Sequence, residues 1–314
     1  MSRFVDYRAV QREGRTAVAI GNFDGVHIGH RALLARVVAK RPALIPGVLT
    51  FSPHPVRVLA PHVEMHMVCT LADRMDLLES AGAQLILAQR FDRTFAQLSP
   101  DAFIEQVLVD SLGVGHLVVG YDFEFGRQRA GNKETLRRAG ERYGFTVDVV
   151  KMQRTGEALV ASSSQVRSLV QRGELKIAGS ILGRPFHLNG RVIHGAQRGR
   201  TIGFPTANLE TTGELLPALG VYSGWLDFGD GPAPAVINLG RKPTFVTDGA
   251  TSLEVHILDA SDLDLYGADC RVFFDARIRD EVTFDGIDSL RAQIGRDAAL
   301  ARTLTASIPL PRFP

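Results

Sequence analysis

The chain of 314 residues is long enough for two domains, and its hydrophobic fraction of 45% allows each of them to bury a core. Its 36 basic and 34 acidic residues nearly cancel, which argues against a protein that coats nucleic acid or an anionic membrane. Cys69 and Cys270 lie far apart, so neither a disulfide framework nor a zinc site is expected. No apolar signal segment or membrane-length apolar run is present, and we expect a cytoplasmic protein.

Apolar runs alternate with amphipathic stretches in the first half of the chain. A helix is expected over residues 30–40, which Pro42 ends, and another from Pro100 to Gly113 with Ser99 as its N-cap. Buried strands are expected at residues 17–20, 47–51, 84–88, 116–119 and 146–150. Strands that alternate with helices predict a Rossmann-like α/β domain, which is a parallel sheet covered on both faces.

The second half of the chain has a different pattern. Its β-like runs are separated by Gly, Pro and Asp turns, with no helical pattern between them, and lie at residues 187–194, 221–227, 233–238, 253–258 and 270–276. One helix is expected over residues 288–304. This pattern predicts an antiparallel barrel or sandwich with a terminal helix. We place the domain boundary near residues 178–184, so the expected domains are 1–182 and 183–314.

The string G-N-F-D-G-V-H-I-G-H occupies residues 21–30, directly after the first expected strand. A helix that begins near Gly29 would present free N–H groups and the positive end of its dipole to an anion. His27 and His30, three residues apart, would point at the same anion and could stabilise a phosphoryl transition state. The simpler alternative is one capping histidine and one surface histidine. The expected phosphate-binding residues of the string are Gly21, Asn22, Phe23, Asp24, Gly25 and Gly29.

A second string, S-S-S-Q-V-R, occupies residues 162–167. Ser162 and Gln165 fit a capping box, so a helix should begin there and run to Gly173. Arg167 would then lie near the positive end of its own helix, which is unfavourable unless an anion binds there. An exposed arginine is the alternative. The expected phosphate-binding residues of this string are Ser162, Ser163 and Ser164.

Two further patterns resemble known motifs but fail on spacing. Residues 62–66 have the histidine spacing of a zinc protease motif with the glutamate in the wrong place. Residues 126–133 end in Gly-Asn-Lys, whereas a P-loop needs its lysine directly after the glycine. We therefore expect neither a zinc protease nor a P-loop.

A glycine- and arginine-rich segment joins two expected strands of the second half. Gly195, Arg200 and Gly203 belong to a cationic loop that could fold over phosphates. Thr206 and Asn208 are two residues apart, so an extended backbone places both on one face, where their oxygens could hold Mg²⁺. An ordinary glycine-rich hairpin is the alternative.

The first two strings resemble the H-x-G-H and S-S-T-x-x-R signatures of nucleotidyltransferases, in the form found in bacterial bifunctional riboflavin kinase/FMN adenylyltransferases. Ser164 replaces the usual threonine and keeps the hydroxyl. The resemblance implies that His27 and His30 contact the phosphates of ATP, and that Arg167 completes their site.

The same resemblance implies that His54 and Asp122, which follow the second and fourth expected strands, line the nucleotide or flavin pocket. From the residues alone, a turn histidine and an Asx-turn aspartate fit equally well. Trp225, Phe125 and Tyr121 are candidates for contact with the flavin ring, because aromatic residues are scarce in the chain.

The string G-F-P-T-A-N at residues 203–208 is similar to the hallmark of riboflavin kinases, whose six-stranded barrel agrees with the all-β pattern. The resemblance makes Glu254 the general base for the ribityl hydroxyl. Glu254 alternates with the apolar Leu253 and Val255, and a carboxylate on the inner face of a barrel would be costly without a function. An outward-facing carboxylate is the alternative.

The resemblance therefore implies two ATP-dependent reactions, riboflavin to FMN and FMN to FAD, with Mg²⁺ as cofactor. The expected partners are these small molecules, with no nucleic acid and no membrane, and the oligomeric state is left open. Two other classes stay open. One is an adenylyl- or cytidylyltransferase for another phosphate substrate, and the other is a non-enzymatic flavin- or nucleic-acid-binding regulator.

Overall fold

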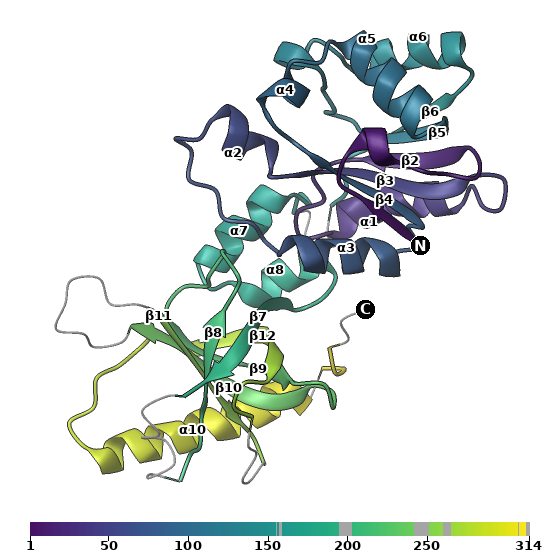
Figure 1. The fold of residues 1–314 in the computed structure, drawn as a ribbon. Helices are drawn as coiled ribbons and strands as arrows, with labels where there is room; N and C mark the ends of the chain where they lie inside the picture. Colours follow the sequence, from purple (N-terminus) through teal and green to yellow (C-terminus); the bar gives the residue numbers. More distant parts are fainter. Residues whose placement is uncertain are drawn as a thin grey trace. The chain divides into compact units, whose positions relative to one another are not determined.

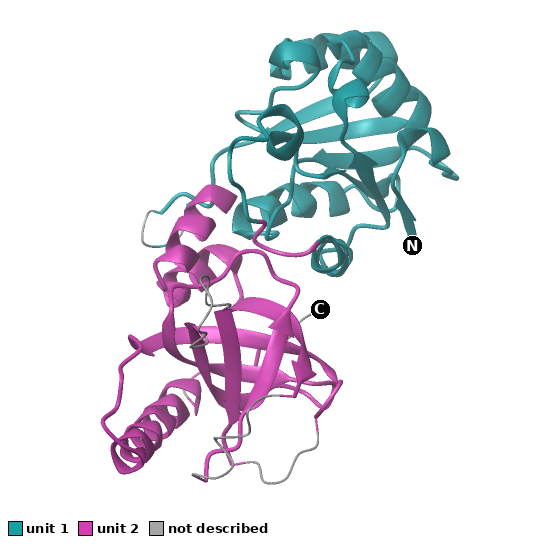
Figure 2. Ribbon diagram, turned by 60° about the vertical axis from the view of Figure 1, so that its left-hand side comes forward, with its two compact units in different colours: residues 1–66, 71–162, 314 teal, residues 67–70, 163–313 magenta. Residues whose placement is uncertain are grey.

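The computed structural model describes residues 1–154, 156, 159–194, 203–241, 251–259, 265–306 and 308–311. The chain divides into two compact units (Figure 2). The first holds residues 1–66 and 71–162, and the second holds residues 67–70 and most of the chain from Ser163 onward. Helices α7 (Ser163–Gln171) and α8 (Leu175–Leu182) therefore group with the second unit, and the domain boundary at residue 182 stays a prediction.

A six-stranded parallel sheet forms the first unit (Figure 1). Its order is β1-β4-β3-β2-β5-β6, so β2 lies between β3 and β5 at the centre of the sheet. The strands are β1 (Ser2–Phe4), β2 (Thr16–Ile20), β3 (Ile45–Ser52), β4 (Leu85–Arg90), β5 (Val114–Gly120) and β6 (Thr146–Val150). The predicted parallel sheet is confirmed, and β1 is an edge strand that the sequence pattern did not reveal.

Helices cover both faces of this sheet, with α1 and α3 on one side and α5 and α6 on the other (Figure 1). The main helices are α1 (Ile28–Val38), α2 (Pro55–Leu59), α3 (Leu71–Ser80), α4 (Arg93–Ala96), α5 (Pro100–Ala102) and α6 (Lys133–Tyr143). Short 3₁₀ turns lie at η1 (Tyr7–Ala9) and η3 (Arg127–Arg129).

The helix predicted from Pro100 to Gly113 begins as expected but does not stay α-helical. The Ser99 hydroxyl accepts a hydrogen bond from the Ala102 N–H group at 3.1 Å, which confirms the N-cap. From Phe103 to Ser111 the backbone is π-helical, and this segment is η2. The wider turn places Phe103, Ile104, Val107 and Leu108 together in the core of the unit.

The second unit is a closed antiparallel barrel with the strand order β10-β11-β8-β7-β12-β9. Its strands are β7 (Phe186–Ile193), β8 (Ala207–Thr211), β9 (Gly220–Asp227), β10 (Ala233–Arg241), β11 (Thr251–Ile257) and β12 (Asp269–Arg279). The predicted barrel is confirmed, although the sequence pattern missed β8.

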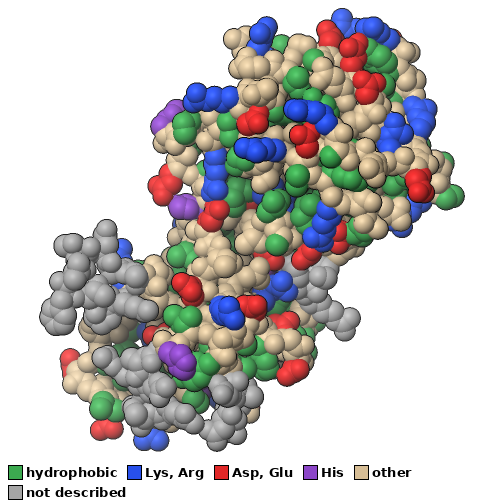
Figure 3. All heavy atoms as spheres, viewed as in Figure 1, with side chains coloured by type: hydrophobic (Ala, Val, Ile, Leu, Met, Phe, Trp, Pro, Cys, Tyr) green, Lys and Arg blue, Asp and Glu red, His purple; other side chains and the backbone are tan. Residues whose placement is uncertain are grey.

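The terminal helix α10 (Ile287–Ala306) covers the outside of the barrel wall. Its Ala298 and Ala301 pack against Val221 of β9 and Val236 of β10. None of the helices in the described part of the chain is long and apolar enough to cross a membrane. On the face shown in Figure 3, basic and acidic side chains are interspersed.

Candidate functional sites

The first candidate site lies where β2 ends and α1 begins. All five residues of β2 are buried, and the loop after it returns to α1, which starts at Ile28. The N-cap of α1 is His27, whose Nδ1 accepts a hydrogen bond from the backbone N–H of His30 at 3.3 Å. The predicted helix start beside the two histidines is confirmed, and His27 is a capping residue as well as a candidate ligand group.

The imidazole rings of His27 and His30 stack on each other, with centroids 3.6 Å apart and an angle of 20° between their planes. Because the Nδ1 atom of His27 accepts a hydrogen bond, a neutral His27 carries its proton on Nε2. The ring of Phe23 packs against the imidazole of His30, with the two ring centroids 5.0 Å apart. The two histidines therefore form one unit at the helix end, as the H-x-x-H spacing predicts.

Gly29 makes room for the His27 ring. A Cβ atom at this position would lie 3.0 Å from Cε1 and 3.1 Å from Nδ1 of His27. It would also lie 3.3 Å from the backbone oxygen of Ala161. The carbonyl of Ala161 thus brings the start of the second string, Ser162, to the first turn of α1.

The loop between β2 and α1 holds an unusual backbone. Phe23, Gly25 and Val26 have φ angles of 49°, 79° and 41°, in the left-handed region. This region is costly for a β-branched residue such as Val26. The side chains of Phe23 and Val26 are fully buried, so packing in the core holds the loop in this conformation. Such strain at a glycine-rich loop is typical of a ligand-binding site.

Two basic groups surround His30. Burial lowers its pKa well below the usual value, and the nearby His27 and Arg74 lower it further. The Nδ1 atom of His30 is buried and has no hydrogen-bond partner among the described residues. His30 is therefore neutral near pH 7 in the free protein and can offer one donor and one acceptor.

Arg74 of α3 is a residue that the sequence reasoning missed. Its side chain is buried, and its Nη1 donates to the backbone oxygen of Phe51 at 3.0 Å. A single arginine in the amphipathic segment at residues 71–80 carries no signal of its own, because charged residues are usual on such helices.

The other residues predicted for the first site lie in several different loops at the carboxyl edge of the sheet. His54 caps α2, its Nδ1 accepting from the Val56 N–H group at 3.2 Å, so the turn interpretation is correct at least for this nitrogen. Asp122 is exposed just after β5, the neighbour of β2 in the sheet. Asn22, Asp24 and the remaining residues of the 21–30 string lie in the loop after β2, at the carboxyl edge of the sheet.

Arg167 lies in the first half of α7, which begins at Ser163 as predicted. The Arg167 side chain is half-buried, and Ser164 is exposed. Because α7 groups with the second unit and the histidines with the first, the joint site of Arg167, His27 and His30 stays a prediction.

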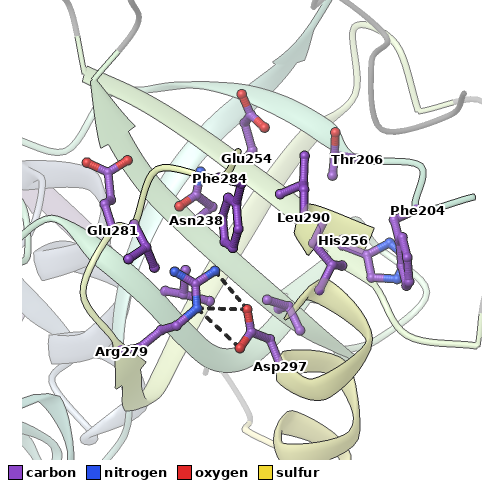
Figure 4. A pocket seen from close by; sticks show the side chains of 14 residues that line it. Phe204, Thr206, Asn238, Glu254, His256, Arg279, Glu281, Phe284, Leu290 and Asp297 are labelled. Atoms are coloured by element: carbon purple, nitrogen blue, oxygen red, sulfur yellow. Dashed lines mark hydrogen bonds and ion pairs between the residues drawn. The ribbon is translucent and has the colours of Figure 1, made fainter. Parts of the chain in front are cut away.

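The second candidate site is a cavity of about 320 Å³ on the wall of the barrel (Figure 4). Glu254 and Thr206 lie at one end of it. Asn208 stands directly opposite Glu254 on the adjacent strand β8, and Asn238 stands opposite it on β10. Cross-strand partners share a face, so Glu254 lies between two amide side chains.

The face on which Glu254 lies differs from the expectation. Leu253 and Val255 are buried and point into the barrel, so Glu254 points to the outside of the wall. Leu290 and Ile294 of α10 line the same cavity and cover this part of the wall. The carboxylate therefore lies outside the barrel interior but in a cavity that a helix lines on one side, which the strand pattern could not show.

An ion pair lies at the other end of the cavity. The Nη2 atom of Arg279 is 2.9 Å from Oδ2 of Asp297, and its Nε donates to the same oxygen at 3.0 Å. Gln293 donates to the other carboxylate oxygen at 2.7 Å. Asp297 is only 4% exposed, so α10 is fixed to the barrel wall by a buried charge pair (Figure 4).

The cavity between these ends is mostly apolar. Its walls include side chains from the barrel and α10 as well as two phenylalanines, and they comprise Phe204, Val221, Val236, Val282, Phe284, Leu290 and Ile294. The sequence-based candidates for ring contact lie elsewhere. Trp225 is fully buried in the barrel and Phe125 is buried in the core of the first unit, and neither lines this cavity. Contact of either residue with a flavin stays a prediction. Tyr121 is exposed in the first unit.

The cationic loop predicted before Thr206 falls partly outside the described residues, and this includes Gly195 and Arg200. Gly203 is described and has a φ angle of 88°, which suits glycine. The segment that follows is fixed by His256, whose ring nitrogen lies 2.8 Å from the backbone oxygen of Pro205. Thr206 is thereby held at the rim of the cavity.

Comparison with known proteins shows the family to which each half of the chain is similar. A family model described as FAD synthetase matches residues 9–164, and one described as riboflavin kinase matches residues 182–305. The bifunctional riboflavin kinase/FMN adenylyltransferase of Escherichia coli K12 is 42% identical over 289 residues, covering 91% of both chains. That of Bacillus subtilis is 34% identical and covers 91% of this chain and 92% of its own. A crystal structure described as a macrolide-efflux protein from Streptococcus pneumoniae has 29% identity and a TM-score of 0.87, covering 96% of this chain and 98% of its own.

The parallel sheet with its histidine pair and the closed barrel with its Glu254 cavity thus define a two-part transferase of flavin nucleotide synthesis. The chain belongs to the bifunctional riboflavin kinase/FMN adenylyltransferase family.

Proposed function

We propose that the barrel phosphorylates riboflavin to FMN and that the parallel-sheet unit joins FMN to AMP from a second ATP, giving FAD. The observation that carries the first step is the placement of Glu254 between Asn208 and Asn238 at the polar end of an otherwise apolar cavity. The observation that carries the second is the histidine pair at the start of α1.

In the kinase step, the apolar walls of the cavity accept the isoalloxazine ring, and the ribityl chain extends toward Glu254. The Glu254 carboxylate takes the proton of the 5′-hydroxyl, whose oxygen attacks the γ-phosphorus of ATP while the bond to the β-phosphate oxygen breaks. FMN and ADP are the products. Helix α10 lines one side of the cavity and would shield that side of the bound flavin ring from water.

Thr206 and Asn208 are the proposed Mg²⁺ ligands. Both supply neutral oxygens beside the Glu254 carboxylate, a donor set that suits a hard cation whose remaining ligands come from ATP phosphates and water. No cluster of three or more His, Cys, Asp or Glu side chains among the described residues forms a protein-only metal site. Bound Mg²⁺ would neutralise charge on the transferred phosphates.

In the adenylyl-transfer step, a phosphate oxygen of FMN attacks the α-phosphorus of ATP and pyrophosphate leaves. FMN phosphate is already largely ionised near neutral pH, so the step needs no protein nucleophile. The Nε2–H group of His27 and the ring of His30 stabilise the charge that develops on the phosphates, together with the N–H groups at the start of α1. Arg167 is the proposed third group, drawn from α7.

The proposed setting is the cytoplasm, with riboflavin, FMN and ATP as the partners and no nucleic acid. Cys69 and Cys270 are both buried free thiols, which is usual for proteins of a reducing compartment.

The proposal predicts a separation of activities by single substitutions. With riboflavin, ATP and Mg²⁺, chromatography of the flavins should show both FMN and FAD for the natural protein. His30→Ala should stop FAD formation while FMN accumulates. Glu254→Ala should block FMN formation and leave the conversion of added FMN to FAD. A folded variant that loses both activities would contradict the assignment of that residue to one unit.

A further inference from the structure

Arg74 is a buried cation that has no carboxylate partner among the residues that the structure describes. The residue is 3% exposed. All its hydrogen bonds to the described residues come from Nη1, which donates to the Phe51 backbone oxygen at 3.0 Å and to the Thr50 hydroxyl at 3.5 Å. Its Nε atom is buried and has no hydrogen-bond partner within the described part of the chain. Most of the donor capacity of this guanidinium is therefore unused.

Such an arrangement is unfavourable in the free protein. An arginine cannot escape the cost of burial by losing its proton, because its pKa is too high. A buried charge is normally compensated by an opposite charge and by hydrogen bonds to all its donors. Two neutral oxygens do not supply this compensation, so the position fits a site that gains its countercharge from a ligand.

The surroundings of Arg74 indicate the kind of anion that would supply the missing negative charge. Phe51 and Thr50 form the carboxyl end of β3, and the Thr50 hydroxyl also donates to the Asn22 backbone oxygen at 2.9 Å. Arg74 is thereby attached to the loop that precedes His27, at the sheet edge where ligands of α/β proteins bind. The nearby charge of Arg74 also lowers the pKa of His30, so the guanidinium group acts on the histidine pair at the start of α1. A phosphate is the anion that this loop and helix end would bind.

We propose that Arg74 is a third phosphate-binding group of the adenylyl-transfer site and pairs with a phosphoryl oxygen of ATP or FMN. This inference rests on the proposed function of the first unit. The fork of Nε and Nη2 is free of hydrogen bonds to the described residues and matches two oxygens of one phosphate. The charge that is unpaired in the free protein is then paired in the complex.

A purely structural role is the competing explanation, in which Arg74 only holds the end of β3. Three variants separate the two roles. Arg74→Gln keeps an N–H donor and removes the charge. Thr50→Val keeps the charge and removes the hydroxyl that links β3 to Asn22. Arg137→Gln removes an exposed charge of the same unit, from α6, and serves as the control.

The measurement is FAD formation from added FMN and ATP, with the KM determined for each substrate and riboflavin kinase activity as an internal control. Arg74→Gln should raise the KM of one substrate by about 10- to 100-fold, the usual effect of losing a charge-assisted hydrogen bond. The substrate with the raised KM identifies the bound phosphate. Kinase activity should stay unchanged, and Arg137→Gln should match the natural protein.

Unchanged KM values for both substrates in Arg74→Gln would overturn the proposal, and so would equal losses in Arg74→Gln and Thr50→Val. A second measurement does not depend on the folding of a variant. In the ¹⁵N-labelled natural protein, saturating pyrophosphate should shift the Nε–H resonance of Arg74, and an unmoved resonance would overturn the proposal. Failure of the natural protein to make FAD from FMN would instead contradict the proposed function itself.

Discussion

Gly29 is the residue on which the shape of the histidine pair depends. Because Gly29 has no Cβ atom, the His27 ring can occupy the space beside its Cα. This explains why the H-x-G-H motif has a glycine at this position. The same ring accepts a hydrogen bond from the N–H group of His30, so the His27 side chain caps α1. The proposed contact of His27 with phosphate therefore has to be made by a residue that also fixes the start of the helix.

Gly29→Ala should therefore reduce FAD formation without affecting the kinase. The new Cβ would come within 3.0 Å of the His27 ring and move it. We expect the rate of FMN adenylylation to fall by about 10²-fold, as for misplaced groups in other phosphoryl sites. Gly295→Ala in α10 is the control. No described atom outside the backbone of its own helix lies within 4 Å of the new Cβ, and the helix should tolerate or favour alanine. Equal activity of both variants would argue against this role of Gly29.

His116 predicts a dependence of stability on pH. It is buried in β5, and its Nδ1 lies 2.6 Å from the Thr146 hydroxyl. Burial lowers its pKa, with a further decrease from Lys40 and an opposing effect from Asp148. The unfolded chain therefore binds this proton more readily, so the free energy of unfolding falls as the pH drops below about 6.5.

The test is thermal unfolding at pH 7 and pH 5 of the natural protein and His116→Gln. The glutamine cannot titrate, so the loss of melting temperature on acidification should be smaller in the variant. The pKa of His30 is lowered as well, so protonation of His30 also destabilises the folded protein at low pH. The melting temperature of His116→Gln should therefore still fall somewhat on acidification. If the melting temperature fell equally in both proteins between pH 7 and pH 5, His116 would not contribute to the pH dependence of stability.

At the scale of elements, α10 is attached to the barrel by two charge pairs of different burial. Arg279 and Asp297 pair inside the cavity on the barrel wall, where Asp297 is 4% exposed. Arg302 and Asp259 pair at the surface, 2.7 Å apart. Both carboxylates accept two nitrogens of their arginine, so burial is the main difference between them.

Asp297→Ala should destabilise the barrel unit by roughly 2–4 kcal/mol, because it leaves Arg279 partly buried without its partner. It should also raise the KM for riboflavin, since the cavity wall carries this pair. Asp259→Ala should change neither quantity noticeably, because exposed pairs contribute little. Chemical unfolding measures the stability of the two variants, and kinase kinetics measure their KM for riboflavin. Equal changes in Asp297→Ala and Asp259→Ala would contradict the prediction.

Sequence patterns predicted the elements with strong periodicity and missed those without it. The edge strand β1 has no buried residue, and in β8 only Leu209 is buried, so neither shows an alternating pattern. The π-helical turn of η2 places apolar residues much as an α-helix would over so short a segment.

The candidate sites show the same division. Alternation with Leu253 and Val255 indicated which residues share a face with Glu254, but not that α10 covers that face. The histidine pair was predicted because both residues lie in one short string. Arg74 was not, because its partners at Thr50 and Phe51 are more than twenty residues away and the contact depends on tertiary packing.

At the scale of the whole molecule, each unit has its own core and its own reaction. The sheet core includes Leu117, and the barrel contains Ile237, and neither side chain is exposed. Substitution of either residue by alanine should lower the free energy of unfolding of its unit by about 2–5 kcal/mol. Two units with separate cores are expected to respond separately to such a loss.

Leu117→Ala and Ile237→Ala thus form a reciprocal pair. During heating, Ile237→Ala should lose riboflavin kinase activity several degrees earlier than the natural protein and keep FMN adenylylation to the natural temperature. Leu117→Ala should do the reverse. Each residual activity is measured with its own substrate supplied, so that a failed first step cannot hide the second. Simultaneous loss of both activities in either variant would mean that the two units unfold as one, and that the second reaction depends on the barrel for more than its supply of FMN.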